Sequence, residues 1–174
     1  MIDRYIPDAY QKSIYTINYG KLKENGIKCL LFDLDNTTVP FTEKEPNKKV
    51  INLFDEIKDM GFRVIIFSNA TKKRLLPFKK KLLVDCMASS RKPSKSSFMK
   101  IINRFNYDLS EVAIIGDQLF TDIYGGNRVG IMTILVNPMS SDEYIWTKVA
   151  RRFEKLKYKK MAKYGILIKG SYYD

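Results

Sequence analysis

Short apolar runs alternate along the chain with longer segments in which apolar residues recur at helical spacing. The runs are typical of strands buried on both faces, and they cover residues 29–32, 63–67, 84–88, 112–115 and 131–136. The intervening segments predict helices over residues 46–61, 71–82, 94–105 and 119–128, the last broken around Gly125-Gly126. Strands that alternate with helices form βαβ units. The pattern therefore predicts an α/β fold in three layers, with a parallel sheet between two layers of helices.

The two ends of the chain are predicted to add one helix each. Residues 9–24 predict a short packing helix that ends at Gly26. From residue 142 the sequence predicts one long, very basic helix to about residue 164, followed by a short tail. We therefore divide the chain into a core with a helical lead-in, residues 1–141, and a basic amphipathic C-terminal segment, residues 142–174.

Polar residues follow the predicted strands at their carboxyl ends. Asp33 and Asp35 lie on one side of the extended chain after the first strand, and their mutual repulsion favours a hard cation such as Mg²⁺. The alternative for this stretch is a plain Asx-type turn in which Thr37 caps the next segment. Ligands of parallel α/β sheets bind beyond the carboxyl ends of the strands. One edge is therefore expected to gather Asp33, Asp35, Ser68, Asn69, Lys92 and Asp117.

These side chains suit the transfer of a phosphoryl group to a carboxylate. Asp33 can attack phosphorus and form an aspartyl-phosphate, which divides the hydrolysis into two steps. Mg²⁺ held by Asp33, Asp117 and a backbone carbonyl near Asp35 would offset the charge of the phosphate. Asp35 can protonate the leaving alkoxide and then accept a proton from water. Ser68 and Lys92 would hold the remaining phosphate oxygens.

Four segments resemble, in order and spacing, the motifs of the haloacid dehalogenase (HAD) superfamily of phosphatases. They are Asp-Leu-Asp-Asn-Thr at 33–37, Ser68-Asn69, Lys92-Pro93 and residues 116–122, and the resemblance spans residues 28–138. It implies that Asp33 is the nucleophile, that Asp35 is the acid and base, and that Lys92 is a third catalytic residue. The implied phosphate ligands are Ser68, Asn69 and Lys92. The implied metal ligands are Asp33, Asp35, Asp117 and Asp122, where Asp122 supports either Mg²⁺ or Lys92.

Cap domains of this superfamily are inserted after the first motif or between the second and the third. Here residues 39–46 form only a short loop, and residues 70–91 have room only for a helix and a strand of the sheet. The resemblance therefore implies a Rossmann-like HAD fold of subclass IIIA without a cap, and its open site suits a large substrate. The size, this layout, the basic tail and the lead-in Ser13-Ile14-Tyr15-x-Ile17 resemble the YqeG-type subfamily. That subfamily is similar to phosphatidylglycerophosphate phosphatases, which implies a phospholipid headgroup phosphate as the substrate.

The charge balance indicates a polyanionic partner. The 174 residues contain 31 Lys and Arg against 19 Asp and Glu, a formal net charge of +12. Such a charge suits nucleic acid, an anionic membrane or a phosphorylated substrate. The alternatives to a lipid substrate are a nucleic-acid end, a phosphoprotein, a sugar phosphate, or a basic RNA- or membrane-binding protein with a vestigial site. Intact Asp33 and Asp35 argue against a vestigial site, and the scarcity of stacking aromatics among the basic residues disfavours nucleic acid.

Two basic segments, residues 72–81 and 148–163, are candidates for contact with an anionic membrane. For the first segment the alternatives are a plain solvated face and attraction of a phosphate. The second segment overlaps an apolar stripe at helical spacing, formed by Ile145, Trp146, Val149, Phe153 and Leu156. Two interpretations stay open: the stripe docks the helix on the domain, or the helix lies in a membrane interface.

The remaining composition indicates the compartment. No apolar run reaches the ~18 residues of a membrane span, and the first residues lack the basic-then-apolar layout of a signal peptide. The chain has no histidine, which removes His-dependent triads and the usual zinc sites. Cys29 and Cys86 are expected to be reduced core thiols. We therefore expect a cytoplasmic protein with peripheral association at the inner face of the membrane.

Overall fold

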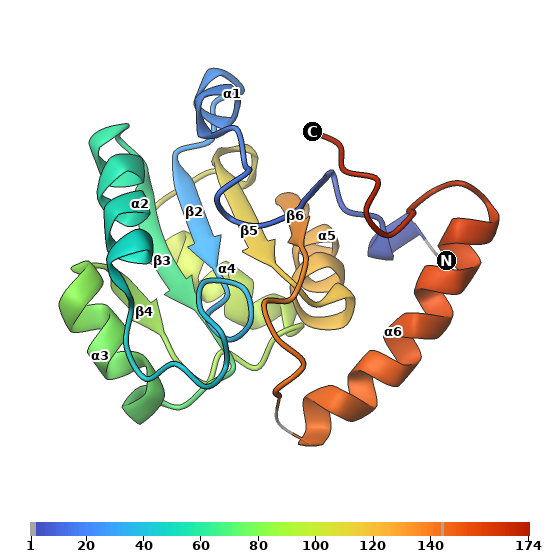
Figure 1. Cartoon of the computed structure of the whole chain (residues 1–174). Helices are drawn as coiled ribbons and strands as arrows, with labels where there is room; N and C mark the ends of the chain where they lie inside the picture. The colour runs from blue at the N-terminus through green and yellow to red at the C-terminus, as the bar shows by residue number, and fades with distance from the viewer. Residues whose placement is uncertain (1–2, 144) are drawn as a thin grey trace.

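The computed structural model describes residues 3–143 and 145–174, and it describes residues 145–148 by their backbone only. Its centre is a sheet of six strands in the order β1-β6-β5-β2-β3-β4 (Figure 1). The strands are β1 (Ala9–Gln11), β2 (Cys29–Phe32), β3 (Arg63–Phe67), β4 (Asp85–Met87), β5 (Val112–Gly116) and β6 (Met132–Val136). Every neighbouring pair is parallel. The predicted parallel sheet is therefore confirmed, and β2 lies inside it.

Helices cover both faces of the sheet. On one face lie α1 (Tyr19–Glu24), α2 (Lys48–Asp59) and α3 (Lys72–Leu82), and Phe32 packs there against Phe54 with ring centres 4.9 Å apart. On the other face lie α4 (Lys95–Arg104) and α5 (Tyr124–Val129), and Phe67 packs against Phe98 with ring centres 4.8 Å apart. The connection between β2 and α2 is a loop, so no cap domain is inserted in it. The three layers and the capless layout match the prediction.

The N-terminal segment differs from the prediction of one helix over residues 9–24. Ala9–Gln11 forms the strand β1 instead, and α1 covers only Tyr19–Glu24. β1 pairs with β6 on one side, and on the other Tyr10 exchanges backbone hydrogen bonds of 2.8 and 2.9 Å with Tyr173. These partners come from distant parts of the chain, so no local pattern marks the strand. The predicted helix end is confirmed, because Gly26 adopts the left-handed φ of 86° that follows many helices.

The helical segment after β5 is irregular at its start, and not at Gly125-Gly126 as predicted. Residues Leu119–Ile123 form a π-helical turn, η3, and α5 continues through Gly125 and Gly126. A Cβ atom on Gly125 would lie 2.6 Å from the Phe98 ring, and one on Gly126 would lie 2.6 Å from the methyl group of Thr133. The two glycines therefore permit close packing of α5 on its neighbours, and they do not interrupt the helix.

The basic C-terminal helix is present as α6 (Ile145–Lys163), and it lies beside the β1 edge of the domain (Figure 1). Its Met161 is fully buried, in a small core with Tyr10 and Leu135 of the last two strands at this edge. Two short 3-10 helices, η1 (Asp3–Tyr5) and η2 (Leu109–Glu111), complete the described elements. Across residues 3–143 and 145–174, no helix is long and apolar enough to span a bilayer.

The face with which α6 docks is not the predicted stripe. Val149, Phe153 and Leu156 are 45, 58 and 63 % exposed, so the interpretation of this stripe as the docking surface is wrong for these residues. The side chains of Ile145 and Trp146 lie outside the described residues. The docking face combines Met161 with the polar side chains described for the site below, and helical periodicity of apolar residues cannot reveal such a face.

Candidate active site

The predicted site residues meet at the carboxyl edge of the sheet. Asp33 directly follows β2 and its backbone N–H donates to the carbonyl of Ile115 at 2.9 Å, which keeps it in register with β5. Ser68 follows β3, Lys92 lies in the loop after β4, and Asp117 follows β5. All four side chains are buried. The parallel topology therefore brings together residues that are up to 84 positions apart.

Lys92 joins two of the carboxylates. Its ammonium donates to Asp33 Oδ1 and to Asp122 Oδ1, each at 2.6 Å, and the side chain is 1 % exposed. Burial alone would lower the pKa of Lys92, but the carboxylates of Asp122 and Asp33 outweigh it and raise this pKa above the usual value. Lys92 thus stays positively charged at the centre of the site.

Asp33, Asp117 and Asp122 place one carboxylate oxygen each within 4.8 Å of one another. Burial raises the pKa of Asp33 to about 8, although Lys92 lowers it, and burial also raises the pKa of Asp117 despite Arg151. Buried, mutually repelling carboxylate oxygens are the donor set that a hard divalent cation stabilises. The residues present therefore fit Mg²⁺.

The two oxygens of Asp122 already have partners. Oδ1 accepts from Lys92, and Oδ2 accepts from the backbone N–H of Gln118 at 3.2 Å. A Cβ atom on Gly116 would lie 2.2 Å from the Asp122 carboxyl group, so only glycine leaves room for this approach. Of the two predicted roles for Asp122, the support of Lys92 agrees with these contacts.

Asp35 lies apart from the three carboxylates. Its Oδ1 accepts from Nη2 and Nε of Arg74 at 2.8 and 3.0 Å, and its side chain is half-buried. Arg74 also donates to the carbonyls of Phe41 and Glu43, so it fastens the loop after β2 to α3. Arg74 was not among the predicted site residues, because the run Lys72-Lys73-Arg74 is typical of a solvated basic face.

Asn69 contacts the loop that carries Lys92. Its Oδ1 accepts from the Lys92 N–H at 2.7 Å and from Ser90 Oγ at 2.9 Å, and its Nδ2 donates to the Lys92 carbonyl at 3.1 Å. The predicted phosphate contact of Asn69 stays a prediction. The observed contacts instead make Asn69 a residue that positions Lys92. Ser68 Oγ accepts from the Ala70 N–H at 3.2 Å, and its hydroxyl proton can be donated to a phosphate.

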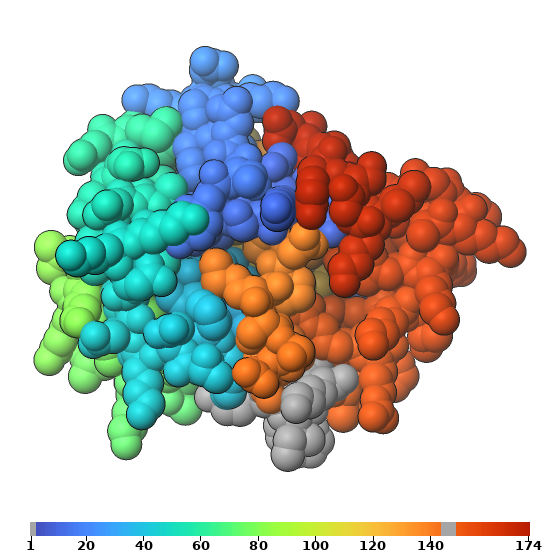
Figure 2. All heavy atoms as spheres, viewed as in Figure 1, coloured from blue at the N-terminus to red at the C-terminus, as the bar shows by residue number. Residues whose placement is uncertain are grey.

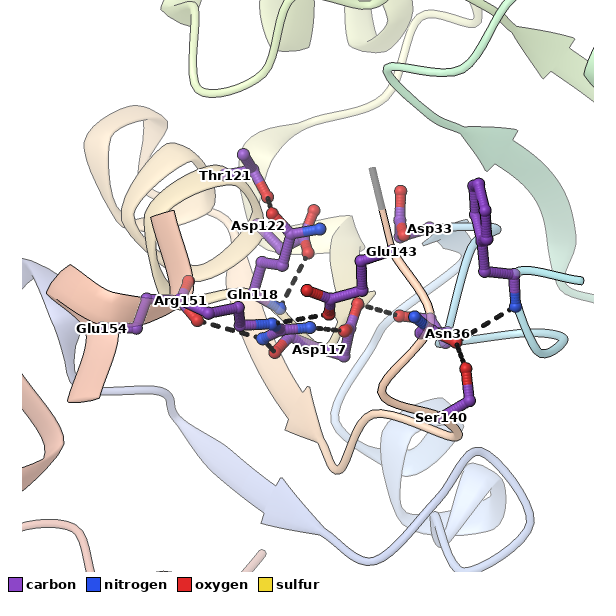
Figure 3. Close-up of polar contacts among 12 residues, drawn as sticks. Asp33, Asn36, Asp117, Gln118, Thr121, Asp122, Ser140, Glu143, Arg151 and Glu154 are labelled. Carbon is purple, nitrogen blue, oxygen red and sulfur yellow. Dashed lines mark hydrogen bonds and ion pairs between the residues drawn. The ribbon is translucent and has the colours of Figure 1, made fainter. Parts of the chain in front are cut away.

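A residue of α6 that the sequence analysis missed completes the site. Arg151 Nη1 donates to the Asp117 carbonyl at 2.7 Å, and Nη2 contacts the Asp117 carboxylate (Figure 3). The guanidinium also contacts Glu143 Oε1 at 2.8 Å and Glu154 Oε2 at 3.0 Å. A sequence signal exists: Arg151 and Glu154 are an oppositely charged pair at i, i+3 within a segment otherwise rich in lysine.

Two residues of the first motif also have roles that the sequence did not reveal. Thr37 Oγ1 donates to Asp117 Oδ1 at 2.8 Å. Asn36 adopts a left-handed φ of 65°, donates to the Asp142 carbonyl at 2.8 Å and accepts from Ser140 Oγ at 2.8 Å (Figure 3). The loop after β2 is thereby connected to the segment that leads into α6.

Comparisons with known proteins agree with this geometry. A family model described as HAD-hyrolase-like matches residues 89–142. The chain is 35 % identical over 151 residues to "Probable phosphatase YqeG" of Bacillus subtilis (strain 168), covering 87 % of this chain and 88 % of that protein. It is 26 % identical over 172 residues to "Phosphatidylglycerophosphate phosphatase 1, chloroplastic" of Chlamydomonas reinhardtii, covering 92 % of this chain and 64 % of that protein.

Solved structures share the fold. The cobalt-bound deoxy-D-mannose-octulosonate 8-phosphate phosphatase of Haemophilus influenzae has a TM-score of 0.56 at 11 % identity, covering 78 % of this chain and 91 % of that chain. A protein from Legionella pneumophila described as a HAD superfamily (subfamily III A) hydrolase has a TM-score of 0.53 at 18 % identity, covering 70 % of each chain. Together with the relative at 35 % identity, these findings show that the chain belongs to the haloacid dehalogenase superfamily of phosphatases, in the family of YqeG.

Proposed function

We propose that this phosphatase hydrolyses the terminal phosphate monoester of a phospholipid headgroup through an aspartyl-phosphate on Asp33. The observation that carries the catalytic part is the buried group of Asp33, Asp117 and Asp122 with Lys92 between two of them. An electron-rich carboxylate, a fixed cation and a set of oxygen donors for Mg²⁺ are what phosphoryl transfer to a carboxylate requires.

In the first step, Asp33 forms a bond to phosphorus while the bond from phosphorus to the ester oxygen breaks. Asp35 gives its proton to the departing alkoxide, which leaves as an alcohol. Ser68 and Lys92 hold the phosphate oxygens, and Lys92 stabilises the charge that develops on them. Mg²⁺ bound by Asp33, Asp117 and the backbone carbonyl of Asp35 would add positive charge beside the phosphate.

In the second step, Asp35 takes a proton from water while the water oxygen attacks phosphorus. The bond between phosphorus and the Asp33 carboxylate breaks, which releases inorganic phosphate and restores both carboxyl groups. Arg74 holds the Asp35 carboxylate at the mouth of the site. Asp35 must therefore share or leave this contact when it reaches the substrate, so Arg74 is a positioning residue in this proposal.

Three features support a lipid at a membrane surface as the substrate. Two relatives bear the name phosphatidylglycerophosphate phosphatase, and they are 25 and 26 % identical to this chain. The site has no cap, so a substrate held in a bilayer can approach it. The exposed stripe of Val149, Phe153 and Leu156 on the basic helix α6 suits insertion into an anionic interface. We place the protein at the cytoplasmic face of the membrane on this basis.

The test compares purified wild type with Asp33→Asn, which keeps the shape of the side chain and removes the attacking charge. The substrates are p-nitrophenyl phosphate and short-chain phosphatidylglycerophosphate, with Mg²⁺ or with EDTA. We expect turnover of both substrates by wild type, background turnover by the variant, and reversible loss of activity in EDTA. Substantial turnover by Asp33→Asn would overturn the mechanism. Turnover of sugar phosphates, phosphopeptides or nucleic-acid ends in place of the lipid would overturn the substrate.

A further inference from the structure

A cavity of about 700 Å³ opens beside Asp117, between α6 and the connection from β6 to α6. Asp117 is one of its lining residues, so the cavity adjoins the candidate active site. Pro138 and Tyr158 contribute apolar wall, and Lys169 of the C-terminal tail lines it as well. Figure 2 shows the orange connection and the red C-terminal segment, which contribute to these walls, on one face of the molecule. The catalytic proposal makes no use of this space.

The charges of the cavity are unbalanced. Its three acids, Asp117, Glu143 and Glu154, all contact Arg151, and Glu154 also accepts from the Phe120 N–H. Its other cations are Arg152, Lys155, Lys159 and Lys169, and none of them has an ion-pair partner among the residues that the structure describes. The cavity therefore presents several uncompensated positive charges next to the site of phosphate hydrolysis.

The spacing of the cations matches an extended anionic group. Arg152, Lys155 and Lys159 lie at i, i+3 and i+7, hence on one face of α6, and they span roughly 10 Å along the helix axis. A substrate with its terminal phosphate at Asp33 must continue beyond the ester oxygen, and this cavity is lined by Asp117, a neighbour of Asp33. A second phosphate a few bonds further along would lie among these cations.

We infer that this cavity binds a second phosphate of the substrate, the phosphodiester of a glycerophospholipid headgroup that ends in the monoester. The inference rests on the proposed function and adds the residues that select the substrate, Lys155 and Lys159 above all. An enzyme built this way prefers a lipid with a monoester and a phosphodiester over a lipid with the monoester alone. Each cation is expected to strengthen binding of the second phosphate only modestly, because solvent and salt partly screen the attraction between the two charges.

The test uses two soluble substrates with the same acyl chains: dihexanoyl phosphatidylglycerophosphate, which has both phosphates, and dihexanoyl phosphatidic acid, which has the monoester alone. The variant is Lys155→Gln/Lys159→Gln. The matched control is Lys160→Gln/Lys163→Gln, which removes the same charge from the same helix outside the cavity. We expect the ratio of kcat/KM for the two substrates to fall about tenfold in the variant and to stay at the wild-type value in the control, since two partly screened charge contacts are lost.

Equal ratios in wild type and variant, or equal losses in variant and control, would overturn the inference. Binding of both lipids to Asp33→Asn by calorimetry tests the cavity without turnover, and it should show the same preference and the same loss with Lys155→Gln/Lys159→Gln. Failure of wild type to hydrolyse any monoester contradicts the proposed function. Lack of a binding preference in Asp33→Asn contradicts this inference, so the two failures are distinguishable.

Discussion

At the scale of single residues, Arg151 shows how a site can depend on a side chain outside its motifs. One guanidinium contacts carboxylates from three segments: Asp117 after β5, Glu143 before α6 and Glu154 within α6. The ammonium group of Lys92 likewise contacts two carboxylates, those of Asp33 and Asp122. Each of these two cations is therefore shared by several carboxylates, and it offsets the negative charge of those buried acids.

We predict that Arg151→Met lowers the free energy of unfolding by about 3 kcal/mol, because loss of one partner leaves buried charges uncompensated. Urea unfolding without Mg²⁺ measures this quantity. The matched control is Arg152→Met, the exposed neighbour on the same helix, which should change stability by less than about 0.5 kcal/mol. Equal effects of the two substitutions would show that the contacts of Arg151 contribute no specific stability.

The raised pKa of Glu154 predicts that the stability of the protein depends on pH. Burial raises its pKa to about 7 from 4.5, although Arg151 lowers it. Between these pH values the folded protein holds a proton that the unfolded chain has released, so the contribution of Glu154 to the free energy of unfolding falls as the pH rises. Urea unfolding at several pH values measures how the free energy of unfolding changes between pH 4.5 and 7. Glu154→Gln should remove the part of this decrease that Glu154 causes. The exposed Glu24→Gln is the control, and a Glu154→Gln slope equal to that of wild type would contradict the prediction.

At the scale of elements, the contacts of helices α5 and α6 are set by unusual residues at their interfaces. α5 packs through glycines, and its Gly125 faces the Phe98 ring of α4. α6 docks through Arg151, Glu154 and Met161, and Glu154 accepts a hydrogen bond from the first turn of η3 at 3.1 Å. Neither α5 nor α6 therefore packs on the domain through a continuous apolar face.

We predict that Gly125→Ala destabilises the protein by about 1–3 kcal/mol, because the added methyl group must displace Phe98 or move α5. Thermal or urea unfolding measures the change. Gly20→Ala is the matched control: it lies in α1, and its Cβ would meet Asn18 Oδ1 at an ordinary 3.4 Å. Alanine favours a helix there, so this variant should be neutral or more stable. Destabilisation of both variants to the same extent would exclude the close contact as the cause.

At the scale of the whole molecule, catalysis and membrane contact are expected on different parts of one surface. The candidate site lies at the carboxyl edge of the sheet, and α6 runs from this site along the side of the domain (Figure 1). One face of α6 lines the cavity at Asp117, and another carries the exposed apolar stripe. A lipid headgroup could therefore enter the site while α6 contacts the bilayer.

We predict that Phe153→Ser/Leu156→Ser weakens sedimentation with phosphatidylglycerol vesicles about tenfold or more, because two side chains lose burial in the interface. Leu109→Ser, which removes an exposed leucine of η2 outside both basic segments, is the control and should leave vesicle binding as in wild type. High salt should release wild type, since part of the attraction is electrostatic. Binding of the double variant at wild-type affinity would show that α6 does not contact the membrane.

The sequence by itself determined five of the six strands, the four helices between them and the edge where the site residues gather. Apolar runs and helical periodicity are local signals, and the carboxyl-edge rule converts the order of parallel strands into proximity. Asp33, Ser68, Lys92 and Asp117 could therefore be placed together before any coordinates, although their roles in catalysis stay predictions.

The tertiary structure alone decided the strand β1, the docking face of α6 and the partners of Asp117. β1 has three residues and gains its backbone partners from β6 and Tyr173. Arg151 is one of many basic residues in its segment, and only the position of α6 brings its guanidinium to Asp117. These features depend on contacts between residues far apart in the chain, for which no local periodicity exists, because burial of a polar group depends on the partner that it meets.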